Sequence, residues 1–345
     1  MTSEVKNKYG VIIVGAGPGG LRCAEILGAA GKKVLLLEKN EEIGPKVCAG
    51  GLTRKSIKLL KIPQEMLSGS SRYIIFRTKR FRTKLDFGEN FIHSVSRKDL
   101  GRWQLQRLDQ NYVDIQTGTE VQKIDGEKVV LRDGRKIEFS FLVGADGSNS
   151  LVRKYVGLKT LLIGVAFQYL VPKKLDEFEI FFDSKLFGSW YSWIFPHNHI
   201  TSIGYGCFPR LFSIKKARKN FMKWIADEKI DLSAAKFEAH PINCDYRGFQ
   251  FKNIFLVGDA AGFTSGFTGE GIYQALVSGE ETAKKILNPR YKCKKIRAIR
   301  REVWIHDMML GFIMFFGPFR NIIFNIVVLA TRNKFCARYL LKILT

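Results

Sequence analysis

The first forty residues follow the hydrophobic pattern of a βαβ unit. An apolar run at 11–14 leads directly into Gly15, a helix-like segment follows, and a second apolar run covers 33–37. A buried strand, a tight turn, a helix and a second buried strand in this order predict the first half of a doubly wound parallel sheet.

The pattern then changes several times before residue 159. We expect a helix over 54–67, two strands within 72–93 and a second helix from Arg97 to Arg107. A small three-stranded meander is predicted from three further segments: 119–124, 128–132 and 136–139. The apolar run from Phe139 to Val143 is predicted to be a separate third strand of the parallel sheet.

Residues 161–207 alternate in the manner of strands joined by short turns, with no intervening helix. They predict an antiparallel sheet rich in aromatic residues, which could pack a core or line a long apolar pocket. A helix over 214–229 follows, then a buried strand from Ile254 and a helix ending at Leu287.

These elements predict a mixed α/β fold with an inserted domain. The expected nucleotide-binding domain is discontinuous and comprises 1–69, 94–159 and 245–288. The expected antiparallel substrate domain comprises 70–93 and 160–244, and 289–345 forms a helical C-terminal region.

Composition also indicates the size of the cores and the cellular compartment of the protein. The chain has 345 residues and 46% hydrophobic content, enough for two domains with substantial cores. The six cysteines are scattered without a C-x-x-C pair, which argues against a metal site or a disulfide framework and for a reducing compartment. The N-terminus is polar up to Tyr9, so we expect a cytoplasmic protein without a secretory signal.

The net charge of +24 requires an anionic partner or surface. Basic residues concentrate between Lys284 and Arg301, where no acid occurs. The apolar stretch that follows, between Asp307 and Arg320, is shorter than the roughly 20 residues of a membrane span, and Gly317-Pro318 should break its helix.

Two interpretations of this C-terminal region remain open, and both can hold at once. It forms a helical hairpin that closes over the core, or it attaches peripherally to an anionic membrane surface. Nucleic acid is the poorer partner, because the basic residues alternate with Leu, Ile, Phe and Met and no nucleic-acid module is recognisable.

The glycine turn carries the first chemical prediction. Gly15, Gly17 and Gly20 have the G-x-G-x-x-G spacing that lets backbone approach a pyrophosphate at a helix N-terminus. Glu38 ends the second strand, at the distance where an acid accepts a hydrogen bond from a ribose hydroxyl. The sequence therefore predicts a dinucleotide site.

Three further stretches are candidates for the same site. Asp146 follows a buried strand, although a bare Asp-Gly is more often only a turn. Gly258-Asp259 ends another buried strand, and the glycine-rich residues 264–271 open the next helix. Cys48 lies in a glycine-rich loop, where it could face the site or simply fill a small gap.

The three signatures Gly15–Gly20 with Glu38, Gly144-Ala-Asp146-Gly147, and Gly258-Asp259 together resemble the FAD flavoproteins of the para-hydroxybenzoate hydroxylase type. The resemblance implies FAD, with its ribose on Glu38. It implies cofactor contacts at these residues: Gly15, Ala16, Gly17, Gly19, Gly20, Glu38, Ala49, Gly50, Arg97, Asp146, Gly258, Asp259, Gly269, Gly271 and Ile272. The acid that this family often has four residues after the arginine is replaced by Gly101.

Two motifs narrow the resemblance to the geranylgeranyl reductases. Lys46-Val-Cys48-Ala-Gly-Gly is similar to their K-x-C-x-G-G loop, and the segment from Tyr191 to Pro196, followed by Gly204-Tyr-Gly206, is similar to their Y-x-W-x-F-P and G-x-G motifs. The implied substrate-pocket residues are Tyr191, Trp193, Phe195 and Pro196.

The implied activity is reduction of isoprenoid double bonds in a membrane lipid or quinone. Such an alkene needs a hydride from reduced flavin and a proton in a dry site, and Cys48 is the candidate proton donor. The external electron donor stays open between NAD(P)H and a ferredoxin-type protein.

Two alternative functions remain. One is an FAD-dependent monooxygenase or halogenase of the same fold, since halogenases carry a related W-x-W-x-I-P motif. The other is a non-catalytic prenyl-binding protein, of the kind represented by the Rab escort and dissociation-inhibitor proteins.

Overall fold

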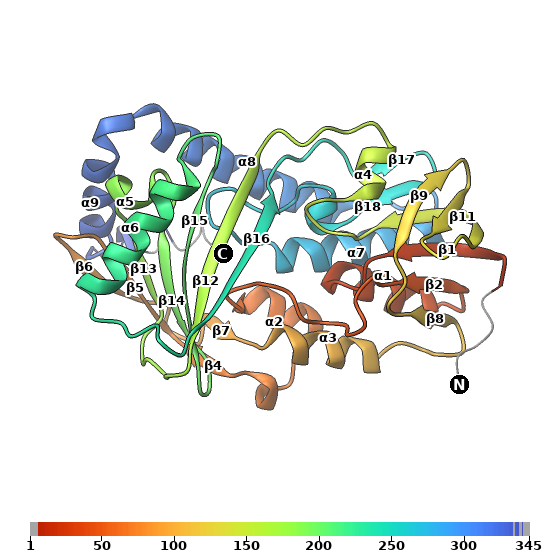
Figure 1. The fold of residues 1–345 in the computed structure, drawn as a ribbon, viewed down its shortest axis with the longest axis horizontal. Helices are drawn as coiled ribbons and strands as arrows, with labels where there is room; N and C mark the ends of the chain where they lie inside the picture. The colour runs from red at the N-terminus through yellow and green to blue at the C-terminus, as the bar shows by residue number, and fades with distance from the viewer. Residues whose placement is uncertain (1–5, 334, 338–339, 341–345) are drawn as a thin grey trace.

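Two large sheets carry the fold, and strand β1 (Lys8–Val14) lies inside the first of them (Figure 1). The computed structural model describes residues 6–333, 335–337 and 340. The strand order of the first sheet is β17 (Gln250–Phe251), β18 (Ile254–Leu256), β11 (Lys136–Gly144), β1, β2 (Val34–Leu37) and β8 (Val113–Gln116). Neighbouring pairs along this order are parallel except β17 with β18. Two further strands, β9 (Val121–Asp125) and β10 (Lys128–Leu131), join the same sheet through an antiparallel pairing of β10 with β11. The parallel part confirms the predicted Rossmann-type α/β fold.

Alternate residues of β1 supply two separate cores. Val11 and Ile13 pack with helix α1 (Pro18–Ala29), whereas Ile12 and Val14 pack with the meander strands β9 (Val121–Asp125) and β10 (Lys128–Leu131). A strand buried on both faces has this continuous apolar sequence because successive side chains point to opposite sides.

Helix α1 packs closely against helix α7 (Ile272–Leu287) at a pair of glycines. A Cβ atom on Gly279 would lie 2.1 Å from the carbonyl oxygen of Gly19, so no side chain fits between the two backbones. Helix α3 (Arg97–Gln106) also contacts α1. Gly19, predicted to contact the cofactor, therefore contributes a close helix crossing in the structure.

The second sheet contains strands from both ends of the expected substrate domain. Its order is β16 (Lys236–Asn243), β12 (Ile163–Val171), β15 (Thr201–Cys207), β14 (Ser192–Pro196), β13 (Glu179–Phe181), β5 (Tyr73–Arg77) and β6 (Arg82–Asp86). Helix α6 (Ile214–Asp227) packs Phe221 and Trp224 against this sheet. A third, three-stranded sheet has the order β3 (Gly51–Thr53), β7 (Ile92–Ser94) and β4 (Gly69–Ser71).

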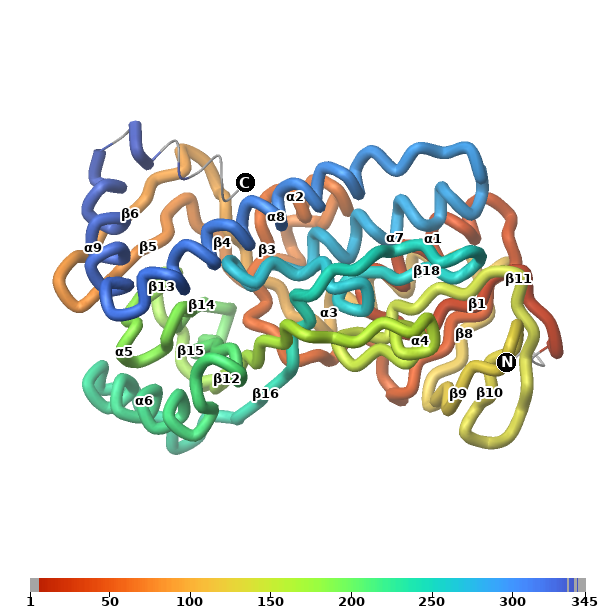
Figure 2. The backbone as a smooth tube through the Cα atoms, turned by 90° about the horizontal axis from the view of Figure 1, so that it is seen from above, coloured from red at the N-terminus to blue at the C-terminus, as the bar shows by residue number. Residues whose placement is uncertain are grey.

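The C-terminal region forms two helices that meet at a sharp bend. Helix α8 (Lys294–Phe315) runs from α7 to the second sheet, and η3 (Gly317–Phe319) joins it to α9 (Arg320–Ala330), as Figure 2 shows. The bend between the two helical segments is 103° and lies at the predicted Gly317-Pro318 break. Residues 334, 338–339 and 341–345 of the predicted helical region lie outside the described residues.

Both C-terminal helices pack against the rest of the chain. Leu310 and Ile313 of α8 are buried, and Val328 of α9 accepts a hydrogen bond from Thr83 of β6 at 2.8 Å. The hairpin interpretation is thus observed for the described part of this region. No single helix among the described residues meets the length and hydropathy needed to cross a bilayer, although the bent α8–α9 pair does so by length and composition together.

Four local predictions were wrong. The helix expected over 54–67 is α2 (Arg54–Leu60), because Lys61 adopts the left-handed conformation that ends it, and a short 3-10 turn, η1 (Gln64–Met66), follows. The two strands expected at 136–139 and 139–143 are one continuous strand, β11.

The remaining two errors concern the second sheet. The short helix α5 (Ser184–Phe187) interrupts the strands, since the Asp183 side chain accepts from the Lys185 N–H and caps it. The sheet is also mixed rather than antiparallel, because β13 pairs in parallel with β5.

Candidate functional site: an FAD cradle and an apolar cavity

The glycine turn after β1 has the close backbone packing that its sequence requires. Gly15 has a φ of +102°, and a Cβ atom there would lie 2.4 Å from the Ala145 carbonyl oxygen. A Cβ on Gly20 would lie 2.1 Å from the Gly15 carbonyl oxygen. Gly17 is the N-cap of α1, so the first N–H groups of that helix face the turn.

Glu38 lies at this turn, as its position after β2 predicts. One carboxylate oxygen accepts from the backbone N–H of Ala16 at 2.9 Å, and the other accepts from the N–H of Asn40 at 3.0 Å. The structure therefore brings the predicted ribose-binding acid and the predicted pyrophosphate turn together.

Asp259 is held in a dense polar cluster. Its Oδ1 accepts from Thr264 at 2.6 Å, and its Oδ2 accepts from Ser148 at 3.0 Å and from Lys46 at 3.1 Å. Burial raises the pKa of Asp259, but the charge of Lys46 and these hydrogen bonds outweigh burial and lower the pKa to about 2. The carboxylate is therefore ionised throughout the neutral range.

The Asp146 side chain, in contrast, binds groups at the start of the next helix. Its carboxylate accepts from the Ser150 hydroxyl at 2.6 Å and from the N–H groups of Leu151 and Val152 at 2.7 and 3.2 Å. These donors belong to the first turn of helix α4 (Leu151–Tyr155), so the side chain caps that helix. Only the backbone of Asp146, which closely approaches Gly15, adjoins the glycine turn.

Arg97 opens helix α3 and lines the large cavity described below. Its Nε is buried and has no hydrogen-bond partner among the residues that the structure describes. Gly101, where the related flavoproteins often have an acid, has a physical role of its own. A Cβ there would lie 2.4 Å from the Cα of Gly44, so the loop before Lys46 can cross α3 only at a glycine.

These residues fit FAD. The turn at Gly15 leaves room for phosphates but not for a side chain, Glu38 offers a carboxylate, and the unpartnered Nε of Arg97 needs an acceptor. Gly271, the N-cap of α7, adds the N–H groups of a second helix N-terminus, and Gly269 has a φ of +68°.

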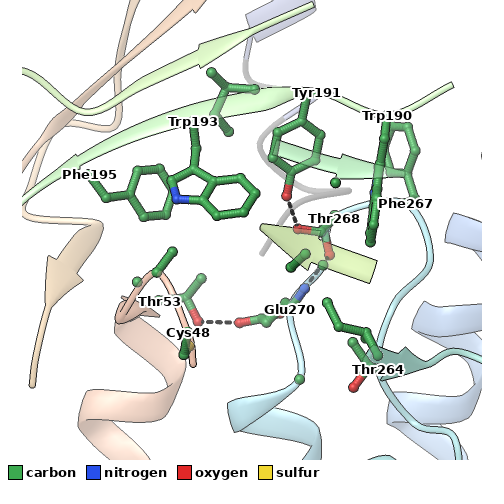
Figure 3. A pocket seen from close by; sticks show the side chains of 18 of the residues that line it. Cys48, Thr53, Trp190, Tyr191, Trp193, Phe195, Thr264, Phe267, Thr268 and Glu270 are labelled. Carbon is green, nitrogen blue, oxygen red and sulfur yellow. Dashed lines mark hydrogen bonds between the residues drawn. The ribbon is translucent and has the colours of Figure 1, made fainter. Parts of the chain in front are cut away.

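A cavity of about 690 Å³ extends from this cradle into the second sheet. Its polar end contains Asp259, Arg97 and Lys46 together with the predicted cofactor residues Ala49, Gly269, Gly271 and Ile272. Its far walls are aromatic and aliphatic side chains of the second sheet and the C-terminal helices. Figure 3 shows Trp193 and Phe195 on one side of the cavity and Cys48 and Thr53 on the opposite side.

Gly204 and Gly206 of β15 make room for the aromatic wall. A Cβ on Gly204 would lie 2.2 Å from the Trp193 ring, and one on Gly206 would lie 2.1 Å from the Trp190 ring. The indole N–H of Trp193 donates to Ser202 at 3.0 Å and is therefore occupied within the sheet. The G-x-G motif thus lets two indole rings lie flat over β15 beside the cavity.

The predicted pocket segment divides into lining and supporting residues. Tyr191, Trp193 and Phe195 line the cavity, and the Phe195 ring lies where a Cβ on Gly51 would be, at 2.7 Å. The Tyr191 hydroxyl donates to the carbonyl oxygen of Thr268. Pro196 does not line the cavity, because it ends β14 with its carbonyl oxygen bound by the Ser94 hydroxyl at 2.6 Å.

The Cys48 loop reaches the cavity from the opposite side. Cys48 is half-buried and lines the cavity, and its Sγ accepts from the Gly50 N–H at 3.4 Å. His197 fixes the loop through a 3.0 Å contact between its Nε2 and the Ala49 carbonyl oxygen. Gly50 has a φ of +74° and a Cβ there would clash with His197, so it shapes the loop while lying outside the cavity lining.

Several lining residues were not predicted as site residues. Glu270 accepts from Thr53 at 2.7 Å and lies 3.0 Å from Lys55, which also pairs with Glu302 of α8 at 2.6 Å. His240 also lines the cavity, and burial followed by the charge of Lys46 lowers its pKa to about 4, so it is neutral at pH 7. Lys46 was visible in the K-x-C-x-G-G motif and Glu270 lies within the predicted stretch 264–271, whereas His240 had no local sequence signal.

The C-terminal helices complete the cavity. The lining residues that they contribute are Met308, Met309, Phe312, Ile313, Ile323, Phe324 and Val327. No group of three or more potential metal ligands occurs among the described residues.

Known proteins match this chain in both sequence and fold. The chain is 29% identical to the geranylgeranyl diphosphate reductase of Rhodobacter capsulatus over 80% of its length and 74% of that protein. It is 28% identical to digeranylgeranylglycerophospholipid reductase 1 of Methanococcoides burtonii over 80% of its length and 73% of that protein.

A solved structure has the same fold. The geranylgeranyl bacteriochlorophyll reductase-like protein of Thermoplasma acidophilum matches with a TM-score of 0.77 and 18% identity, over 94% of this chain and 91% of that one. The FAD binding domain family matches residues 8–287, which include the glycine turn, Glu38, Arg97 and Asp259. The chain therefore belongs to the FAD binding domain family, and it is an FAD-dependent oxidoreductase.

Proposed function

We propose that this enzyme reduces isoprenoid double bonds in a membrane lipid or a quinone. The names of its reductase relatives support an isoprenoid substrate. The observation that carries the proposal is the cavity, whose polar end lies at the FAD cradle and whose long walls are aromatic and aliphatic. A site of this size and polarity suits a flexible hydrocarbon chain.

Reduced FAD supplies a hydride to one alkene carbon when it is bound. The chain's own residues exclude water and orient the substrate. The polar atoms of Tyr191 and Trp193 are occupied by Thr268 and Ser202, so these side chains present their ring faces to the substrate. Their role is to shape the pocket.

The proton for the second carbon has to come from a polar group that faces the cavity. Cys48 meets this requirement, because it lines the cavity and its Sγ accepts from the Gly50 N–H at 3.4 Å, which leaves the S–H to donate. The Cys48 loop is fixed on both sides, by Lys46 on Asp259 and by His197 on Ala49. We propose Cys48 Sγ as the donor, with an external NAD(P)H or ferredoxin-type protein as the electron source.

We also propose peripheral attachment of the C-terminal helices to the cytoplasmic side of an anionic membrane. These helices leave a set of large apolar side chains exposed: Trp304, Ile305, Met308, Phe312, Phe315, Phe319, Ile322, Ile326, Val327 and Leu329. Met308, Phe312 and Val327 both line the cavity and face outward. A hydrocarbon chain could therefore pass from the bilayer into the cavity without crossing water.

Product mass tests the proposed reaction. Dithionite-reduced enzyme is incubated anaerobically with geranylgeranyl lipids and geranylgeranyl quinones, and each product is expected to gain 2 Da, or a multiple, per molecule. Products of unchanged mass with every substrate would refute the reductase assignment. In air, a product that gains an oxygen atom would identify the enzyme as a monooxygenase instead.

A point variant tests the membrane attachment. Phe315 is 84% exposed, so Phe315→Asp should fold normally and weaken vesicle binding by more than tenfold. Leu211→Asp, at an apolar side chain that is 53% exposed before α6, is the matched control. Equal binding by the two variants would show that the C-terminal helices are not the attachment site.

A further inference from the structure

A second hollow of about 580 Å³ lies outside the reaction cavity. It is formed between the N-terminal half of α8 and the loop before β17. Its lining residues are Tyr246, Phe249, Ile296, Arg297, Arg300, Arg301 and Trp304. The groove thus combines an aromatic floor with three guanidinium groups, all on exposed residues.

The protein balances the charge of this groove only in part, through the electrostatic interaction of Arg300 with Asp307. Within the described residues, no carboxylate forms an ion pair with Arg297, Arg300 or Arg301, whereas the nearby Lys295 pairs with Glu280 at 2.7 Å. The Arg300 guanidinium lies 4.4 Å from the Tyr246 ring centroid, which holds it in the groove. Guanidinium forks match phosphate oxygens in geometry and charge.

The groove is continuous with the exposed apolar face of α8. Arg297, Arg301, Trp304, Met308 and Phe315 follow one another at intervals of three, four or seven residues, so they lie on one side of the helix. Trp304 is 57% exposed, Met308 59% and Phe315 84%. At a rise of about 1.5 Å per residue, the stripe changes from the basic Arg297 and Arg301 through Trp304 to the fully apolar Met308 and Phe315 over roughly 27 Å.

This order matches the profile of a membrane surface. Anionic headgroups attract the arginines, tryptophan prefers the interface, and Met and Phe enter hydrocarbon. An acidic protein or a nucleic acid would satisfy the arginines but would leave Met308 and Phe315 in water. A single partner therefore explains the whole stripe only if it is a phospholipid bilayer.

We propose that the groove of Arg297, Arg300 and Arg301 binds the phosphate of an anionic phospholipid. The bound headgroup fixes α8 on the membrane so that Met308 and Phe312, at the mouth of the reaction cavity, face the hydrocarbon. This site is separate from the reaction cavity and rests on the proposed membrane attachment.

Vesicle flotation with the full-length, FAD-loaded protein tests the groove. The variant carries Arg297→Gln, Arg300→Gln and Arg301→Gln. The matched control carries Lys215→Gln, Lys219→Gln and Lys223→Gln, which remove the same charge from exposed lysines on α6. Vesicles consist of phosphatidylcholine alone or with 30% phosphatidylglycerol, and flavin absorbance verifies folding of both variants.

On phosphatidylglycerol vesicles, the groove variant should lose on the order of 100-fold in partitioning, and the α6 control less than about threefold. Soluble dihexanoyl-phosphatidylglycerol should change the Trp304 fluorescence of the wild-type protein, measured as the difference from Trp304→Phe. Inorganic phosphate should change it only at far higher concentration.

Two results would refute the proposed phospholipid site in the groove. One is equal vesicle binding by the groove variant and the α6 control. The other is saturation by inorganic phosphate at the same concentration as the short-chain lipid, which would make it a site for a soluble phosphate. Wild-type protein that binds neither kind of vesicle would instead refute the membrane attachment itself. An unchanged product mass in the alkene-reduction assay refutes only the proposed reaction.

Discussion

Replacing Lys46 by methionine should destabilise the protein in a pH-dependent way. Lys46 lies 3.1 Å from Asp259, whose side chain is 14% exposed. The variant keeps the length of the side chain but leaves the carboxylate with only the Thr264 and Ser148 hydroxyls. In the variant, burial still raises the pKa of Asp259, but the charge of Lys46, which is the largest effect that lowers it, is absent.

The magnitude follows from the pKa of Asp259. Folding lowers it from 3.8 to about 2, a depression that corresponds to about 2 kcal/mol of stability. Because the folded pKa is the lower one, this stability is fully present above the unfolded pKa and is lost as the pH falls toward 2. About 1 kcal/mol of it should be gone at pH 3.

Urea unfolding of the FAD-free protein at pH 6 and pH 3 measures the effect. Lys46→Met should be about 2 kcal/mol less stable than wild type at pH 6, and this deficit should shrink by at least about 1 kcal/mol at pH 3. Lys46→Arg should behave like wild type, and Lys215→Met, at an exposed α6 lysine, should show no pH-dependent deficit. A Lys46→Met deficit of equal size at both pH values would refute the reasoning.

Three further predictions follow from the site. Cys48→Ser should keep the flavin absorbance but slow alkene reduction or release partly reduced products, and unchanged turnover would remove Cys48 from the mechanism. Gly204→Ala should destabilise the fold by about 1–3 kcal/mol and lower the amount of substrate bound, since its methyl overlaps the Trp193 ring. Gly311→Ala, in open space, should not destabilise the fold. Glu38→Ala should weaken FAD binding by roughly 10- to 100-fold in equilibrium dialysis, and unaltered affinity would contradict a ribose contact.

The first sheet could be predicted from the sequence because its signals are local. The apolar runs, Gly15 and Glu38 all act within one βαβ unit, and the structure places them as the pattern requires. Asp146 combines two local signals. Its backbone follows the strand as the pattern predicts, whereas its side chain accepts from Ser150 and Leu151, four and five residues later, and caps α4.

The cavity could be predicted only in part. The aromatic residues of β14 and the glycines of β15 are visible in the sequence, but the pairing of Trp193 with Gly204 depends on the register of two strands. The contribution of α8 and α9 to the cavity wall depends on a contact between distant parts of the chain. Neither feature has a local pattern from which it could be derived.

The discontinuous first sheet also has a consequence for synthesis on the ribosome. The glycine turn is made early, but β18, which completes its sheet, and the 3-10 turn η2 (Gly258–Ala260), which contains Asp259, follow only after the whole second sheet. The wall of the cavity is complete only when α8 and α9, which follow later in the chain, have also been made. A nascent chain therefore exposes an incomplete apolar cavity until residues 294–330 have been made, and transiently exposed hydrophobic surface of this kind favours aggregation.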